Sequence, residues 1–205
     1  MKKTFIVALS LLVTVAAGCS KKSSTEPEEL TAAEYLAQGW NNFVMGSYST
    51  ALSRFDNAIG KDASMADAYN GKGWCQGILG SPAGALATFK VGLSHSGSNN
   101  EIKAGMAFTY AAMDSFSQAV TYGLNVLTAD SLWQFSHTYR ESPRDNKLDC
   151  KEVRLLLAQN YFKLGQFSSS LLWVQKLNPG YSVDVITVTG QAALQVEIER
   201  LAGTM

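Results

Sequence analysis

Residues Tyr35 to Ile59 read YLAQGWNNFVMGSYSTALSRFDNAI, and much of this stretch returns thirty-four residues later. The recurring positions are Tyr35, Gly39, Trp40, Gly46, Ala51, Leu52 and Phe55, which return as Tyr69, Gly73, Trp74, Gly80, Ala85, Leu86 and Phe89. Self-similarity at a fixed period of this length is typical of repeat architectures, in which each unit stacks on the next. The repeat therefore decides the fold class.

Each copy of the repeat has the pattern of two amphipathic helices joined by a turn. Apolar and small residues recur at helical intervals on both sides of Gly46, and the second copy does the same around Gly80. Gly39 would let the paired helices approach closely, and Phe55 would fill the space between them. A single pair cannot bury its apolar face alone, so we expect the copies to stack.

The pattern of an aromatic residue, a Gly, a turn Gly, an Ala and a Phe at this period resembles the tetratricopeptide repeat (TPR). The resemblance implies an all-α, right-handed superhelix of about four helical hairpins. We expect repeats at about 31–62, 64–97, 98–127 and 149–179, an insertion at 128–148 and a closing helix at about 183–202, all within one domain, 31–205. The resemblance to the tetratricopeptide repeat also implies a scaffold or adaptor that binds proteins or peptides, and not an enzyme.

The third copy departs from the pattern at two positions. Asp114 replaces the turn glycine, and Gly123 stands where Phe89 predicts an aromatic residue. Tyr122 is the candidate to supply the missing packing. This copy is therefore the weaker match.

Helix starts are marked by polar residues that stand three positions before an acid, as in a capping box. The four pairs are Thr31 with Glu34, Ser64 with Asp67, Ser98 with Glu101, and Asp149 with Glu152. At the other end of the chain, Leu194, Ile198 and Leu201 fall on one helical face. That face predicts a closing helix, which a repeat stack needs to cover its last apolar surface.

Residues 1–18 have the composition of a removed signal peptide. Lys2 and Lys3 precede an apolar run at 5–15, which is too short to cross a bilayer of about 30 Å as a helix. We therefore expect this segment to direct export and to take no part in the fold.

The residues that follow, Ala16, Ala17, Gly18 and Cys19, resemble a bacterial lipobox. The resemblance implies that Cys19 is acylated, and more than one acyl chain would make a stable anchor. An ordinary cleaved signal with a coincidental Cys is the alternative. Residues 19–30 would form a lipidated, flexible tether. We expect a cell-envelope location, on the outer membrane facing the periplasm if the source has two membranes.

The composition excludes a strong nucleic-acid footprint. The chain has 17 basic and 17 acidic residues, and removing Lys2 and Lys3 leaves the acidic ones in excess by two. With 46% hydrophobic residues the chain can bury a sizeable core. We therefore expect envelope proteins or peptides as partners, the membrane through the acyl chains, and no nucleic acid.

The concave side of such a stack is lined by the first helix of each hairpin. The resemblance places Trp40, Trp74, Phe108 and, in the fourth copy, Gln159 at one inward-facing position. The predicted partner-binding groove comprises Leu36, Trp40, Phe43, Val44, Trp74, Ile78 and Phe108. A large apolar patch of this kind marks a binding site when it is exposed. The alternative is that these aromatic residues are simply core.

The insertion contains a second aromatic pattern. Trp133, Phe135, His137 and Tyr139 alternate with polar residues, which is the period of an extended strand. Such a segment could lie along the groove as a fixed plug or as a movable lid. A groove closed in this way would also suit a carrier of an apolar small molecule or acyl chain, the alternative function.

The residues suited to chemistry are few. His95 and His137 have no ligand neighbours at metal-binding spacing, so we expect no metal, no cofactor and no catalytic residues. An exported chain can oxidise its thiols. Cys75 and Cys150 lie two copies apart, and we expect separate thiols unless the insertion folds the chain back on itself.

Overall fold

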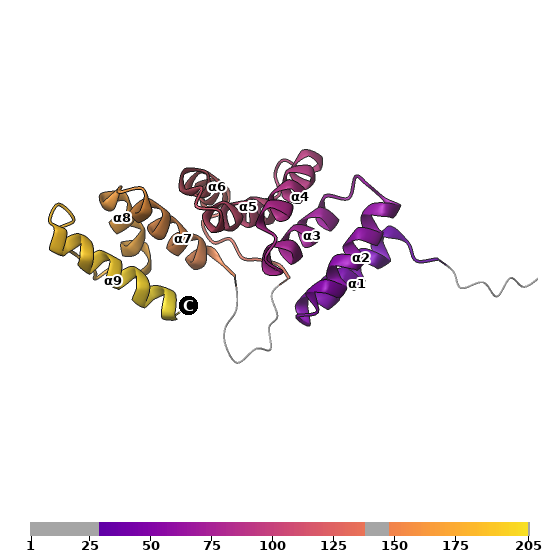
Figure 1. Ribbon diagram of the computed structural model, residues 1–205, viewed down its shortest axis with the longest axis horizontal. Helices are drawn as coiled ribbons and strands as arrows, with labels where there is room; N and C mark the ends of the chain where they lie inside the picture. Colours follow the sequence, from indigo (N-terminus) through magenta and orange to yellow (C-terminus); the bar gives the residue numbers. More distant parts are fainter. Residues whose placement is uncertain (1–28, 138–147, 205) are drawn as a thin grey trace, which may run out of the picture.

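The chain folds into a row of helical hairpins in a computed structural model, which describes residues 29–137 and 148–204. The hairpins are α1 (Ala32–Val44) with α2 (Tyr48–Lys61), α3 (Ala66–Ile78) with α4 (Pro82–His95), α5 (Asn100–Ala112) with α6 (Phe116–Ala129), and α7 (Cys150–Lys163) with α8 (Phe167–Leu177). A final helix, α9 (Val188–Thr204), follows them. Figure 1 shows the helices arranged along an arch from α1 to α9. The prediction of an all-α superhelical stack of four hairpins with a closing helix is confirmed.

Two phenylalanines join the first three hairpins. Phe55 on α2 is fully buried, and its ring lies against both Gly39 on α1 and Gly71 on α3. A Cβ added to Gly71 would lie 2.2 Å from this ring, so no side chain fits there. Phe89 on α4 repeats the arrangement between Gly73 and Gly105. Glycine is therefore required where the second helix of one hairpin wedges between two first helices.

The third hairpin reverses this packing. At Gly123 on α6, where the pattern calls for an aromatic residue, the Cδ2 atom of Leu157 lies 3.1 Å from the position of an added Cβ. Leu157 belongs to α7 and is fully buried. The large side chain thus comes from the next first helix and fills the space that Gly123 leaves. Tyr122 does not take over this role as expected; it stacks on Tyr110, with ring centroids 5.5 Å apart.

The turns within the hairpins need a left-handed residue. Gly46, Gly80 and Gly165 have φ values of 74°, 81° and 70°. Asp114 has a φ of 53° at the equivalent place in the third hairpin. An L-residue with a side chain is strained in this region, although Asp tolerates it better than most. Asp114, which makes the third copy a weaker match to the repeat, therefore keeps the turn but leaves some strain in the backbone.

Two of the four predicted helix starts are correct. Thr31 and Asp149 form complete capping boxes with Glu34 and Glu152. The other two are wrong, since Met65 and Asn99 occupy the cap positions instead of Ser64 and Ser98. The carboxylate of Glu101 is consequently free of any capping role, and it bonds elsewhere.

Helix α9 covers the end of the stack. Leu194, Ile198 and Leu201 are buried against the fourth hairpin, as their spacing predicts. Glu197 accepts a hydrogen bond from Asn178, which ties α9 to the end of α8, and another from Arg200 within α9. None of the helices in the part of the chain that the structure describes is long and apolar enough to span a bilayer.

Candidate functional site

The aromatic residues at the repeated inward position share one wall, although they come from three different helices. Trp40, Trp74 and Phe108 lie on α1, α3 and α5, and the rings of Trp74 and Phe108 are 6.2 Å apart. All three belong to one apolar cluster that also contains Phe135. The period of the repeat therefore places these residues on the same side of the stack.

The chain itself covers much of this wall. We call residues 131–137 the inner segment. Its Trp133 and Phe135 are each 4% exposed. The ring of Phe135 lies 5.0 Å from that of Trp74 and 6.1 Å from that of Trp40. The ring of His137 stacks flat on Trp40, with centroids 3.5 Å apart and an interplanar angle of 5°.

A polar cluster holds the tip of the inner segment. The carboxylate of Glu101 accepts hydrogen bonds from the backbone N–H of Ser136 at 2.7 Å and from its hydroxyl at 2.6 Å. Asn70 donates to the other oxygen at 2.8 Å, and Nδ1 of His137 lies 3.5 Å from it. Burial alone would raise the pKa of Glu101, but the hydrogen bonds from His137, Ser136 and Asn70 outweigh it and hold the pKa below its ordinary value.

The inner segment is also fixed at its base. The N–H of Phe135 donates to the carbonyl of Leu148 at 2.9 Å, and Gln134 pairs with Asp149 in an antiparallel bridge. Trp40 is joined to the polar cluster at the tip, because its indole N–H donates to Asp67 at 3.0 Å and Asp67 also accepts from Asn70 at 3.3 Å. The segment is thus held at its tip by Glu101 and at its base by the chain that leads into α7.

The predicted partner groove is therefore only partly open. Trp40 is 7% exposed, which leaves it little surface to offer another molecule, whereas Ile78 is 48% exposed. The remaining members are half-buried: Leu36, Phe43, Val44, Trp74 and Phe108. Of the residues assigned to a plug or lid, Tyr139 lies outside the described residues, as does the proposed lipid attachment at Cys19. Partner binding at these positions stays a prediction.

A small apolar cavity remains beside the covered wall. It has a volume of about 280 Å³ between α3 and α5. Its lining includes Trp74, Ile78, Phe89, Phe108, Thr109 and Leu148. Two of these, Trp74 and Phe108, belong to the repeated inward position. Trp74 and Phe108 therefore also line an accessible apolar cavity.

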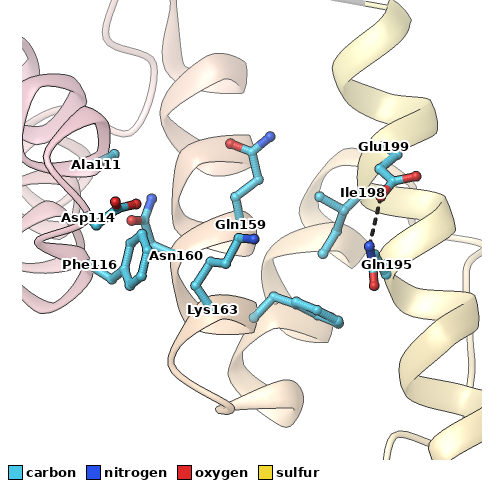
Figure 2. Close-up of a pocket in the computed structure, with 10 residues that line it drawn as sticks. Ala111, Asp114, Phe116, Gln159, Asn160, Lys163, Gln195, Ile198 and Glu199 are labelled. Carbon is cyan, nitrogen blue, oxygen red and sulfur yellow. Dashed lines mark hydrogen bonds between the residues drawn. The ribbon is translucent and has the colours of Figure 1, made fainter.

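A larger and more polar cleft lies between α7 and α9. It has a volume of about 400 Å³, and we call it the amide cleft. Its lining residues are Ala111, Asp114, Phe116, Gln159, Asn160, Phe162, Lys163, Gln195, Ile198 and Glu199. Figure 2 shows Gln159 and Lys163 on α7 facing Ile198, Gln195 and Glu199 on α9. Gln159 occupies in the fourth hairpin the place that Trp40, Trp74 and Phe108 occupy in the others.

The sequence predicts that Gln159 faces inward, but it does not predict the cleft. One wall of the cleft belongs to α9, which carries no copy of the repeat and so has no expected inward position. The signal that could have found it was the fourth-copy change from an aromatic residue to an amide. The role of Glu101 was also missed, because its spacing from Ser98 suggested a cap.

The described residues hold no group of three or more His, Cys, Asp or Glu side chains arranged to bind a metal. Cys75 and Cys150 are both buried and free. Burial raises the pKa of Cys75 to about 12, so its thiol stays protonated at neutral pH and is a poor nucleophile.

Comparison with known proteins gives the fold. No family model and no curated protein matches the chain. Among solved structures, PilW, described as a widely conserved type IV pilus biogenesis factor, has a TM-score of 0.58 at 18% identity, covering 78% of this chain and 67% of PilW. A MamA fragment from Desulfovibrio magneticus has a TM-score of 0.58 at 11% identity, covering 72% and 74%.

A tetratricopeptide repeat protein from Parabacteroides merdae gives a TM-score of 0.55 at 15% identity. The match covers 84% of this chain and 60% of that protein, so the chain spans less than two thirds of its length. Likeness at such identities shows the fold alone. The fold is that of tetratricopeptide repeat proteins.

Proposed function

We propose that the chain is a membrane-anchored scaffold or adaptor of the cell envelope that binds other proteins or peptides through the open part of its concave wall. The observation that carries the proposal is the amide cleft, a solvent-open space of about 400 Å³ that continues the repeated inward position at Gln159. This volume lies within the range of about 300 to 1,000 Å³ that is typical of ligand sites. The TPR fold supports the proposal, since such stacks present long concave surfaces.

Anchoring rests on the sequence of the first nineteen residues. A short apolar run followed by Ala16, Ala17, Gly18 and Cys19 supports lipid attachment at Cys19. We expect the wild-type chain to incorporate labelled fatty acid and to sediment with membranes, and Cys19→Ala to lose both properties. A Cys75→Ala variant is the matched control and should keep both. Equal labelling of the two variants and the wild type would remove Cys19 as the attachment site.

A second candidate, the carrier of an apolar small molecule, is favoured by the cavity next to Trp74, Phe108 and Leu148. Its volume of about 280 Å³ is at the small end of ligand sites. Native mass spectrometry of the protein purified from its source separates the two candidates. A stoichiometric polypeptide supports the scaffold, whereas a co-purifying lipid supports the carrier and contradicts the scaffold as the main role.

A further inference from the structure

One side-chain hydrogen bond of the first hairpin is not made in the second. The indole N–H of Trp40 on α1 donates at 3.0 Å to Asp67, which lies in the first turn of α3. Thirty-four residues further along, the same two positions hold Trp74 and Glu101, and Glu101 lies in the first turn of α5. The period of the repeat therefore pairs the indole of Trp74 with the carboxylate of Glu101.

The inner segment occupies the carboxylate instead. Glu101 accepts from the backbone N–H of Ser136 at 2.7 Å and from its hydroxyl at 2.6 Å. The indole N–H of Trp74 is buried and has no hydrogen-bond partner among the described residues. A buried donor without an acceptor is costly. The contact that holds the inner segment thus takes the acceptor that Trp74 lacks.

We infer that Ser136 and His137, the tip of the inner segment, form a releasable latch. When the latch opens, the carboxylate of Glu101 exchanges the two donors of Ser136 for the indole N–H of Trp74. Ser136 is exposed, so water can satisfy its N–H and hydroxyl after release, whereas the buried Trp74 N–H gains a partner only by the exchange. The donors lost and gained largely offset one another, so the open state is a populated minor state.

Opening the latch uncovers Trp40 and leaves the base of the inner segment in place. The ring of His137 covers Trp40 with centroids 3.5 Å apart, and Trp40 is 7% exposed. The base has separate contacts, since Trp133 and Phe135 are each 4% exposed and the N–H of Phe135 donates to Leu148. The latch therefore controls access to the covered half of the wall. This control goes beyond the proposed scaffold function and is independent of what binds at the amide cleft.

NMR spectra of the ¹⁵N-labelled full chain test the latch, because each indole N–H gives its own signal. Trp40 supplies the reference position for an indole that donates to a carboxylate. Ser136→Ala removes the hydroxyl donor, and Ser136→Pro removes the hydroxyl and the backbone N–H together. A double variant, Ser136→Pro with Glu101→Ala, also lacks the acceptor. Leu132→Ala is the control in the same segment, since Leu132 is 73% exposed.

In the wild type we expect the Trp74 indole and the Ser136 amide to share one exchange process, with roughly 1 to 10% of molecules open. Ser136→Ala should raise the ratio of open to latched molecules by roughly tenfold, the loss of about one good hydrogen bond. Ser136→Pro should bring the Trp74 indole signal close to that of Trp40. The alanine variant keeps the backbone donor, so the test does not depend on the proline variant folding.

The control should match the wild type. In the double variant the Trp74 signal should stay at its wild-type position, because the acceptor is gone. An unshifted Trp74 signal in both single Ser136 variants would overturn the latch and make the inner segment a fixed plug. An equal shift with and without Glu101 would overturn the exchange of donors. No partner is present in these spectra, so either failure leaves the scaffold function untouched.

Discussion

The two halves of the concave wall use one repeated position in opposite ways. In the first three hairpins the position holds Trp40, Trp74 and Phe108, and the inner segment packs on them. In the fourth hairpin it holds Gln159, which lines an open cleft. The comparison shows that a position's place in the repeat fixes which way it faces, whereas the residue type decides whether the surface becomes core or stays available to a partner.

The largest expected effect breaks the covered half. Phe135→Ala removes a ring that is 4% exposed and lies among Trp40, Phe43 and Trp74. We expect the free energy of unfolding to fall by about 3 to 5 kcal/mol, measured by denaturant titration. Leu132→Ala in the same segment is the control, since Leu132 is 73% exposed and should change stability little. Equal effects of the two changes would show that the segment is not part of the core.

The next effect concerns the carboxylate that holds the segment's tip. Glu101→Gln keeps the size of the side chain but removes the charge that accepts from Ser136 and Asn70. We expect a loss of about 1 to 3 kcal/mol at neutral pH. Because the pKa of Glu101 is lowered in the folded state, its contribution is present above the unfolded pKa and is lost as the pH falls through the folded value.

The stability difference between wild type and Glu101→Gln should therefore shrink as the pH drops below 4.5, the ordinary value for this carboxyl. Urea titrations across this pH range measure it. Groups that titrate in both proteins, such as Glu34, cancel in the difference. A difference that is constant with pH would mean that the charge of Glu101 does not stabilise the segment.

A smaller effect on stability is expected at Asp114, which lines the amide cleft. Asp114→Gly should stabilise the protein by about 1 kcal/mol, because its φ of 53° suits glycine better. The reverse change, Gly80→Asp, should destabilise it by a similar amount. Gly80 has the same left-handed conformation and open space around it, so backbone strain is the main change. Thermal melts of both variants check the pair, and a destabilising Asp114→Gly would point to a specific role for the Asp114 side chain.

The smallest expected effect on stability tests whether the inward position is packed differently in the two halves of the wall. Gln159→Ala should change stability by no more than about 0.5 kcal/mol, because Gln159 lines an open cleft. Trp40→Ala at the equivalent position should cost about 3 to 5 kcal/mol, because Trp40 is buried. Similar losses at both positions would mean that the two halves are packed alike. Denaturant midpoints measured in parallel decide this.

Much of the fold could be predicted because its determinants are local and periodic. Within a single copy, Gly39 and Phe55 indicate close packing of the two helices, and Gly46 indicates the turn between them. The period of the repeat then predicts the same features in the next copy. The common wall of Trp40, Trp74 and Phe108 follows from the same period. The alternation of Trp133, Phe135 and His137 predicted an extended segment. Residues 133–135 are non-helical with an isolated bridge at Gln134, whereas 131–132 and 136–137 are turns.

The rest depends on contacts between distant parts of the chain. Glu101 meets Ser136 thirty-five residues away, and no spacing rule connects them. Leu157 fills the space over Gly123 from the following hairpin, where a search for a substitute aromatic residue pointed to Tyr122. The amide cleft needs α9, whose position is set by the burial of Leu194 and its neighbours. The sequence pattern contains none of these pairings.

The stack of His137 on Trp40 has a consequence for how the protein comes apart. In a simple linear array each unit touches only its neighbours, so an end unit can open alone at small cost. Here the first hairpin grips chain that belongs after the third, and Gln134 ties that chain to the start of α7. Opening α1 and α2 must therefore also separate Trp40 from Phe135 and His137. We expect the terminal hairpin to share the stability of the middle of the stack and the row of units to melt cooperatively.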